Sequence, residues 1–306
     1  MIGNVIVAGL LMFAPPDTGG PIGEGHQRGR EAGVTLKDSQ IVVTGTGLSG
    51  KSDGYRIKRP CWYEPRGNAA DMLDSQIEAL PDALPGQEWE RRKEALEPFE
   101  ARIGQEGTWW QRAYNSADPA GMACAAGLAE PYVFAPPNTT PPNGITIAEL
   151  VEIARAALTV PEPKIELNPD AKSYVNLPTW VWLDGAGETT RSVTATLPGV
   201  MSATVTANLT NLEIDSGTTD DRATVETKGC GLKGTPYRKG ADFTCGVSYK
   251  RASIDQPRGV YVLEVTSVWE IDIEDDVVPF AYDPVEVGAT RDVPVGEVQS
   301  TVRKTG

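Results

Sequence analysis

Apolar and polar residues alternate over most of the C-terminal half of the chain, which predicts β-strands there. The clearest run spans residues 260–271, directly after a turn at Pro257-Arg258-Gly259. Shorter alternating runs, several of them ending at turn residues such as Asp184-Gly185, occupy 179–183, 194–197, 202–209 and 211–214. Several short strands with regular turns are typical of an antiparallel sandwich. We therefore predict a mainly β fold, with an immunoglobulin-like β-sandwich over residues 171–306.

The N-terminal half mixes strand and helix patterns. Strand signals at 40–44 and 55–63 are followed by helix-prone stretches at 71–80 and 88–103, which predicts a small α+β module over residues 34–135. Residues 136–170 are rich in proline and are expected to be a linker that carries one amphipathic helix. Thr146 and Glu149 have the spacing of a capping box at the start of that helix.

The first 33 residues are expected to be a signal-like segment followed by a Gly-rich linker. The apolar run 5–14 has the length of the hydrophobic region of a signal peptide and is too short to span a bilayer. The basic residues that normally precede such a run are missing, and a start further upstream would supply them. The alternative is a buried strand or a short helix. No other stretch of the sequence predicts a transmembrane span.

Composition and charge exclude several classes of function. A net charge of −14 argues against electrostatic binding to nucleic acid or to anionic membranes. The cysteines do not form a C-x-x-C pair, so neither a zinc site nor another metal or cofactor is expected. An even number of widely spaced cysteines is typical of two disulfides in an oxidising compartment. His26 is the only histidine, which excludes Ser-His-Asp and Cys-His catalysis.

Residues 45–52, Gly-Thr-Gly-Leu-Ser-Gly-Lys-Ser, match the phosphate-binding P-loop pattern. In a P-loop, backbone amides after Gly45 and Gly50 would cradle phosphate, Lys51 would reach the terminal phosphates and Ser52 would hold Mg²⁺. That geometry requires a helix that begins at the Lys-Ser pair. Asp53-Gly54 predicts a turn there instead. A Gly-rich hairpin loop is therefore the favoured interpretation, and a nucleotide-binding protein is the alternative.

Tryptophans and clustered carboxylates suggest two further ligands. Trp109-Trp110 could stack on sugars, so a carbohydrate-binding module is a second alternative, although aromatic residues in a strand more often pack in a core. Asp272, Glu274 and Asp275, with Asp276, could bind Ca²⁺ through carboxylate oxygens. A solvated acidic edge is the favoured interpretation of that cluster.

Three stretches of the C-terminal half resemble a family of secreted actinomycete proteins that often carry the automatic label "ATP/GTP-binding protein". These stretches are 174–183, which contains Leu-Pro-Thr-Trp-Val-Trp, then 234–249, and then 259–269. The last part resembles a PKD-type immunoglobulin-like domain. Its usual W-D-x-G-D-G strand is replaced by Glu213-Ile214-Asp215-Ser216-Gly217. The resemblance implies a sandwich and export, and it brings no catalytic residues.

Taken together, the sequence predicts an exported, non-enzymatic protein of the cell surface or the secreted fraction. We expect disulfides Cys61–Cys124 in the α+β module and Cys230–Cys245 in the sandwich. The expected role is a structural, adhesion or accessory component of a cell-envelope or secretion assembly. Its partners would be other envelope or secreted proteins, bound through the sandwich.

Overall fold

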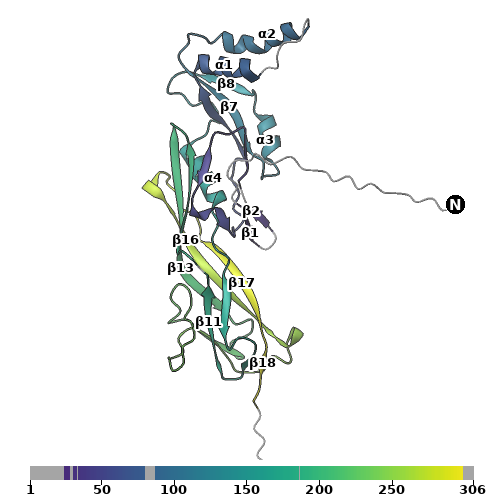
Figure 1. The fold of residues 1–306 in the computed structure, drawn as a ribbon, viewed down its shortest axis with the longest axis vertical. Helices are drawn as coiled ribbons and strands as arrows, with labels where there is room; N and C mark the ends of the chain where they lie inside the picture. The colour runs from purple at the N-terminus through teal and green to yellow at the C-terminus, as the bar shows by residue number, and fades with distance from the viewer. Residues whose placement is uncertain (1–23, 28–29, 33, 80–86, 186, 299–306) are drawn as a thin grey trace, which may run out of the picture.

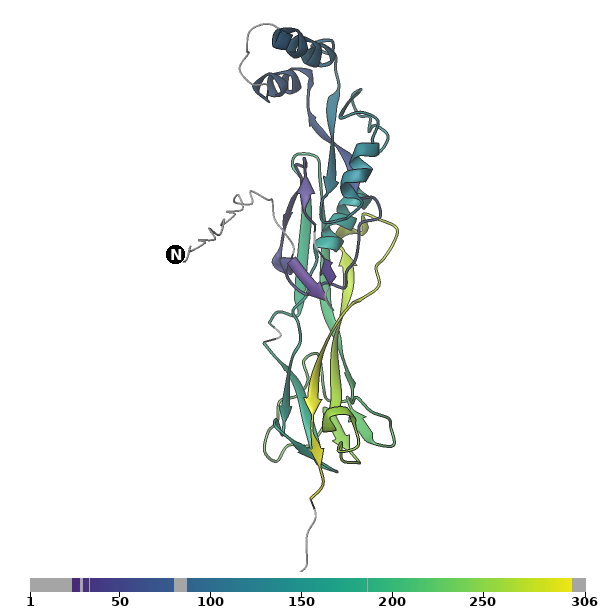
Figure 2. The same cartoon turned by 90° about the vertical axis from the view of Figure 1, so that its right-hand side faces the viewer.

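The computed structural model describes residues 24–27, 30–32, 34–79, 87–185 and 187–298, and within them the protein is a rod (Figures 1 and 2). Helices α1 (Ala69–Ala79) and α2 (Gln87–Glu100) lie at one end of the rod, and strand β18 (Val295–Gly296) lies at the other. Strands outnumber helices along the chain, so the predicted mainly β class is confirmed.

Two long strands form the centre of the rod. β13 (Met201–Asp215) and β16 (Tyr261–Ile273) pair antiparallel in a five-stranded sheet of order β17-β16-β13-β12-β4. The edge strands are β17 (Val285–Val293) and β4 (Val42–Thr44), and β12 (Thr190–Leu197) lies between β13 and β4. All five are rich in β-branched residues and contain no proline, as continuous ladder pairing requires. A register shift between Leu209 and Asn211 marks the middle of β13.

The inward face of this sheet contributes side chains to two hydrophobic cores, which follow one another along the rod. In the upper core, Val205 and Trp269 pack with helix α4 (Ile147–Ala157). In the lower core, Leu212 and Leu263 of the same two strands pack with a second sheet of order β14-β15-β11-β9. That sheet consists of β14 (Ala223–Glu226), β15 (Gly246–Tyr249), β11 (Pro178–Asp184) and β9 (Lys164–Asn168). The lower half is therefore a two-sheet sandwich, as expected.

Helix α4 is part of the upper core, although the sequence placed it in a linker. The predicted capping box is present, with the Thr146 side chain accepting from the Glu149 backbone N–H and Glu149 bonded back to Thr146. Every helical residue from Leu150 to Ala157 is buried. β4 also joins the sandwich sheet, since Val43 pairs with Ala195. Packing thus crosses the boundaries predicted at residues 136 and 171, because the upper half of the long sheet needs both elements to cover and extend it.

The apical end contains a separate small sheet and two helices. β3 (Leu36–Lys37), β6 (Cys61–Gly67), β7 (Thr108–Asn115) and β8 (Tyr132–Ala135) form the sheet, so the predicted α+β character is confirmed. Met72 of α1 and Phe99 of α2 pack on Trp109. The strand predicted over 55–63 begins only at Cys61, after Pro60. Cys124, which the sequence placed in a loop, lies in α3 (Gly121–Gly127).

Short elements complete the described chain. Within the predicted N-terminal linker, β1 (Glu24–Gln27) pairs with β2 (Arg30–Ala32) and with β5 (Ser49–Gly50). β10 (Ser173–Tyr174) pairs with β18, and single turns of 3₁₀ helix occur at η1 (Thr46–Leu48), η2 (Pro257–Gly259) and η3 (Glu274–Asp276). The signal-like run 5–14 lies outside the described residues. Among the helices that are described, none is long and apolar enough to cross a membrane.

Candidate binding cleft and the predicted site residues

Residues 45–52 attach the N-terminal region to the upper core rather than forming a phosphate loop. Gly45 and Gly50 both have φ of 144°, and a Cβ at Gly50 would lie 2.3 Å from the Val160 carbonyl oxygen. A Cβ at Gly45 would lie 2.1 Å from the carbonyl oxygen of Ser192 in β12. Both glycines are therefore required for close backbone approach.

The groups that would bind a nucleotide already have partners within the protein. The Lys51 backbone N–H donates to the Val160 carbonyl at 2.7 Å, and Val160 N–H donates back at 2.8 Å. The Lys51 ammonium lies 3.2 Å from Glu162. Ser52 is buried, and its hydroxyl accepts from the Gly54 N–H at 2.9 Å. Since Lys51 begins an isolated bridge and no helix, the arrangement that a P-loop requires is absent.

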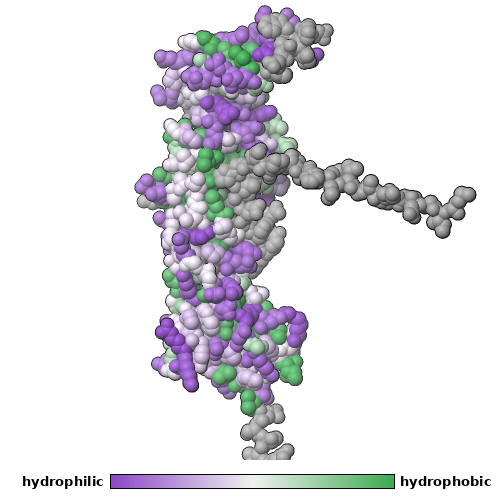
Figure 3. Space-filling model, in the orientation of Figure 1, coloured by the Kyte–Doolittle hydropathy of each residue, from purple (hydrophilic) through white to green (hydrophobic). Residues whose placement is uncertain are grey.

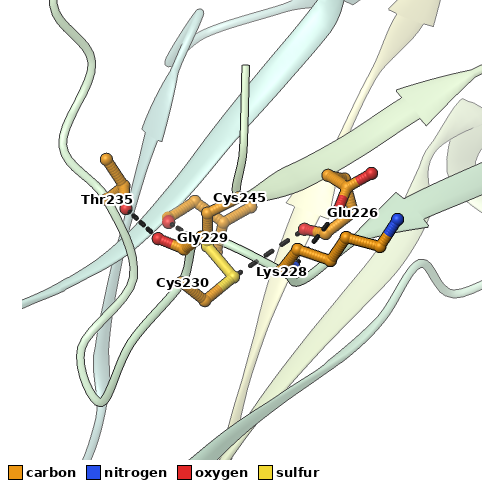
Figure 4. Close-up of a disulfide and its surroundings, with 7 residues drawn as sticks. Glu226, Lys228, Gly229, Cys230, Thr235 and Cys245 are labelled. Atoms are coloured by element: carbon orange, nitrogen blue, oxygen red, sulfur yellow. Dashed lines mark hydrogen bonds between the residues drawn. A yellow bond between two sulfur atoms is a disulfide. The ribbon is translucent and has the colours of Figure 1, made fainter. Parts of the chain in front are cut away.

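Both expected disulfides are present, one in each half of the rod. Cys61–Cys124 joins β6 to α3, and Cys230–Cys245 closes the loop between β14 and β15 (Figure 4). Next to the second disulfide, the Thr235 hydroxyl donates to the Gly229 carbonyl at 2.5 Å. Two disulfides fit an extracellular protein.

The tryptophans do not provide the sugar-stacking platform that the sequence suggested. Trp109 and Trp110 are 5% and 8% exposed, and both pack in cores. Trp180 is also buried, against the rings of Tyr237 and Phe243 at 5.8 and 5.5 Å. The acidic residues 274–276 form η3, and no group of three or more potential ligands in the described chain could hold a metal ion.

A cleft beside α4 brings together polar groups from three distant segments. It has a volume of about 310 Å³ and is lined by Asp53, Tyr55, Lys58, Arg155 and 280–283. Arg155 is 2% exposed and lies over the rings of Tyr55 and Tyr282, at 4.8 and 5.6 Å from their centroids. These are cation–π distances, which suits a guanidinium removed from water.

Both cations of the cleft are paired with carboxylates of the protein. The Arg155 guanidinium forms an ion pair with the Asp53 carboxylate. Lys58 donates its backbone N–H to Glu152 at 2.9 Å, and its ammonium lies 3.2 Å from the same carboxylate. A carboxylate placed on an exposed lysine raises the lysine pKa, and this is the direction found for Lys58. With its cations already neutralised, the cleft suits an uncharged ligand better than an anion.

Two hydroxyls give the cleft unused hydrogen-bonding capacity. The Tyr55 and Tyr282 oxygens are both shielded from solvent, and neither meets the geometric criteria for a hydrogen bond to another described residue, although each hydroxyl is close enough to the other to affect its pKa. Burial raises the pKa of both phenols, so both remain neutral donors. The rings themselves meet edge to face at 5.3 Å. The cleft therefore presents aromatic edges and two neutral phenols, and none of the described residues that line it is a nucleophile beside a base.

Sequence reasoning did not find this cleft. Glu152 and Arg155 are three residues apart on α4, and the available signal was two charged residues within its buried, otherwise apolar stretch from Leu150 to Ala157. Their partners come from segments about 100 residues away on either side, and alternation patterns do not report such distant contacts.

No family model, curated protein or solved structure matches this chain. The fold and its cross-links define a mainly β, disulfide-containing rod. The resemblance to secreted actinomycete proteins with a PKD-like domain stays a prediction.

Proposed function

We propose that this is an exported, non-enzymatic structural or adhesion protein that serves a cell-envelope or secretion assembly. The observation that carries the proposal is the continuity of β13 and β16 through both cores. A pair of strands that crosses the boundary between two cores holds them at a fixed distance. Such a rod suits a spacer that presents binding surfaces away from its point of attachment.

The surface supports the same role. Figure 3 shows hydrophilic residues mixed with small hydrophobic patches at both ends of the rod, and paler residues along much of its middle. On the sandwich, the long loop between β14 and β15 is pinned by Cys230–Cys245 and exposes Tyr237 and Leu232 at its surface. A loop held rigid by a disulfide loses little conformational entropy when a partner binds it. It is the part of the sandwich that we expect to contact other envelope or secreted proteins.

Cell fractionation with thiol mapping tests the proposal. Protein taken from its native compartment should be recovered outside the cytoplasm, with all four cysteines resistant to alkylation until they are reduced. Free thiols in freshly isolated protein would overturn export. Saturable micromolar binding of a fluorescent ATP or GTP analogue with Mg²⁺, lost in Lys51→Ala, would establish the nucleotide-binding alternative instead.

Carbohydrate binding is the second candidate function, and the two tyrosines that line the cleft favour it. Neutral sugars combine apolar ring faces with hydroxyls, and the paired charges of the cleft leave donors and aromatic rings to meet them. A glycan array should then show binding that Tyr55→Ala weakens, whereas Trp182→Ala, outside the cleft, leaves it unchanged. An array without any hit would exclude this candidate.

A further inference from the structure

One sheet of the sandwich carries an acidic outer face, and a loop of the other sheet is basic. β13 and β16 contain no lysine or arginine, and their burial alternates, with Leu263, Val265 and Trp269 buried on the inward side. The intervening carboxylates therefore lie on the open side of the long sheet. We call this surface the acidic face, and it consists of Glu213, Asp215, Glu264, Glu270 and Asp272. Across residues 259–290 the sequence has eight acidic residues and no basic one.

Like charges meet directly on the acidic face. Asp215 of β13 is the register partner of Glu264 of β16. Like charges directly opposite each other on neighbouring strands destabilise a sheet. A cationic surface laid across this face would turn that repulsion into attraction.

A concentration of basic residues lies in the loop that joins two strands of the other sheet. Residues 227–241, which we call the basic loop, include four lysines or arginines and no acidic residue, although Glu226 and Asp242 flank them. Lys228, Arg238 and Lys239 are exposed, and no carboxylate in the described chain forms an ion pair with any of the three.

The packing of Tyr237 fixes the direction in which the basic loop points. Its ring contacts Trp180, whose strand neighbours Thr179 and Val181 are fully buried on the inward side of β11. Because residues alternate along a strand, Trp180 faces away from the lower core. Tyr237 and the adjacent Arg238 and Lys239 therefore lie on the outer side of the second sheet, opposite the acidic face.

We propose that copies of this chain associate front to back, with the acidic face of one copy on the basic loop of the next. Each copy has one surface of each kind, on opposite sides of the sandwich. Such a contact is heterologous, so it leaves one free surface at each end and builds an open row of rods rather than a closed dimer. This inference concerns association alone and does not depend on export or adhesion.

Ionic strength gives the association a distinctive dependence. Whole molecules repel each other because each carries a net charge of −14. The screening length is about 30 Å at 0.01 M salt, about 10 Å at 0.1 M and about 3 Å at 1 M. Long-range repulsion therefore dominates at the lowest salt, and the contact pairs themselves are screened at the highest. Association is strongest between these limits.

Sedimentation velocity of charge-reversed variants tests the proposal. The loop variant carries Lys228→Glu, Arg238→Glu and Lys239→Glu, and the face variant carries Glu213→Lys, Glu270→Lys and Asp272→Lys. Each variant alone presents two surfaces of the same sign and should remain monomeric. In an equimolar mixture, the unchanged acidic face of the loop variant can bind the unchanged basic loop of the face variant. The reversed face and the reversed loop are also complementary, so the mixture should associate as the wild type does. This rescue distinguishes a surface contact from a folding defect, because misfolded variants would not restore each other.

A matched control separates the basic loop from net charge. The control variant carries Arg56→Glu, Arg91→Glu and Lys93→Glu, all exposed and outside the sandwich, and its net charge equals that of the loop variant. It should keep wild-type association near 0.1 M salt. Wild-type protein that is monomeric at every salt and at its highest soluble concentration would overturn the proposal. A mixture of the two variants that fails to associate, or a control that fails as completely as the loop variant, would also overturn it.

Discussion

The two disulfides should contribute unequally to stability, and the difference follows from how much chain each one closes. Cys61–Cys124 spans a sequence separation of 63, and Cys230–Cys245 spans 15. The loop-entropy relation gives about 4.3 kcal/mol for the longer loop and about 3.0 kcal/mol for the shorter one. Replacing each pair with alanine should therefore lower the free energy of unfolding by these amounts, with the greater loss in Cys61→Ala/Cys124→Ala.

Urea denaturation followed by tryptophan fluorescence measures both losses. With an m-value of about 3 kcal/mol/M, the midpoints should fall by about 1.4 M and about 1.0 M. Met122→Ala is the matched control, because Met122 lies two residues from Cys124 on α3 and is 70% exposed, so its midpoint should not move. Reduction of the wild type should approach the sum of the two losses, since the bridges lie in different halves of the rod.

Equal losses, or a greater loss for the short loop, would refute this reasoning. Either outcome would mean that the bridges act mainly on the folded state, through packing around the buried Cys230 and Cys245, rather than on the entropy of the unfolded chain. A transition that splits into two steps in one variant would show that the upper and lower cores unfold separately.

Three further substitutions test particular contacts in the upper half. Gly50→Ala should destabilise by more than about 1 kcal/mol because its Cβ meets the Val160 carbonyl at a positive φ, and a thermal midpoint equal to that of wild type would contradict this. Tyr282→Phe should leave stability unchanged or raise it slightly, since it removes a buried hydroxyl without a partner; a clear loss in urea would reveal an unrecognised bond. Burial raises the pKa of Glu64, so the folded state binds that proton more tightly than the unfolded state does. Stability from Glu64 is therefore present below its unfolded pKa and is lost as pH rises through its folded pKa. Glu64→Gln should flatten this decline when the free energy of unfolding is measured across the same pH window. An unchanged slope would assign the pH dependence to other groups.

Local patterns predicted the elements well but not their partners. The alternation at 260–271 predicted β16, and the capping box at Thr146 predicted the start of α4, because both signals depend on neighbouring residues only. The pairing of Val43 with Ala195 joins residues far apart in the chain, so β4 could not be assigned to the sandwich sheet from the sequence.

The candidate site shows the same limit more sharply. Residues 45–52 match the P-loop sequence motif but do not have the backbone geometry of a P-loop. The turn residues Asp53-Gly54 already indicated that no helix follows the motif. The cleft, by contrast, is not marked by any sequence motif. Arg155 contacts Asp53 and Tyr282 because α4 packs against the segments that contain these two residues. That packing depends on the whole upper core.

The path of β13 and β16 through both cores determines how the rod would respond to mechanical load. Tension along the rod axis acts nearly parallel to these strands, so the ladder bonds between them would be loaded in shear, many at once. Unzipping would need a force across the strands, which breaks the bonds one after another. β17, which leads into the C-terminal strand, pairs with β16 over nine register positions from Val285 to Val293 and would share the load in the same way. A molecule attached at its C-terminal end and bound at its apical end would therefore be pulled in its most resistant direction.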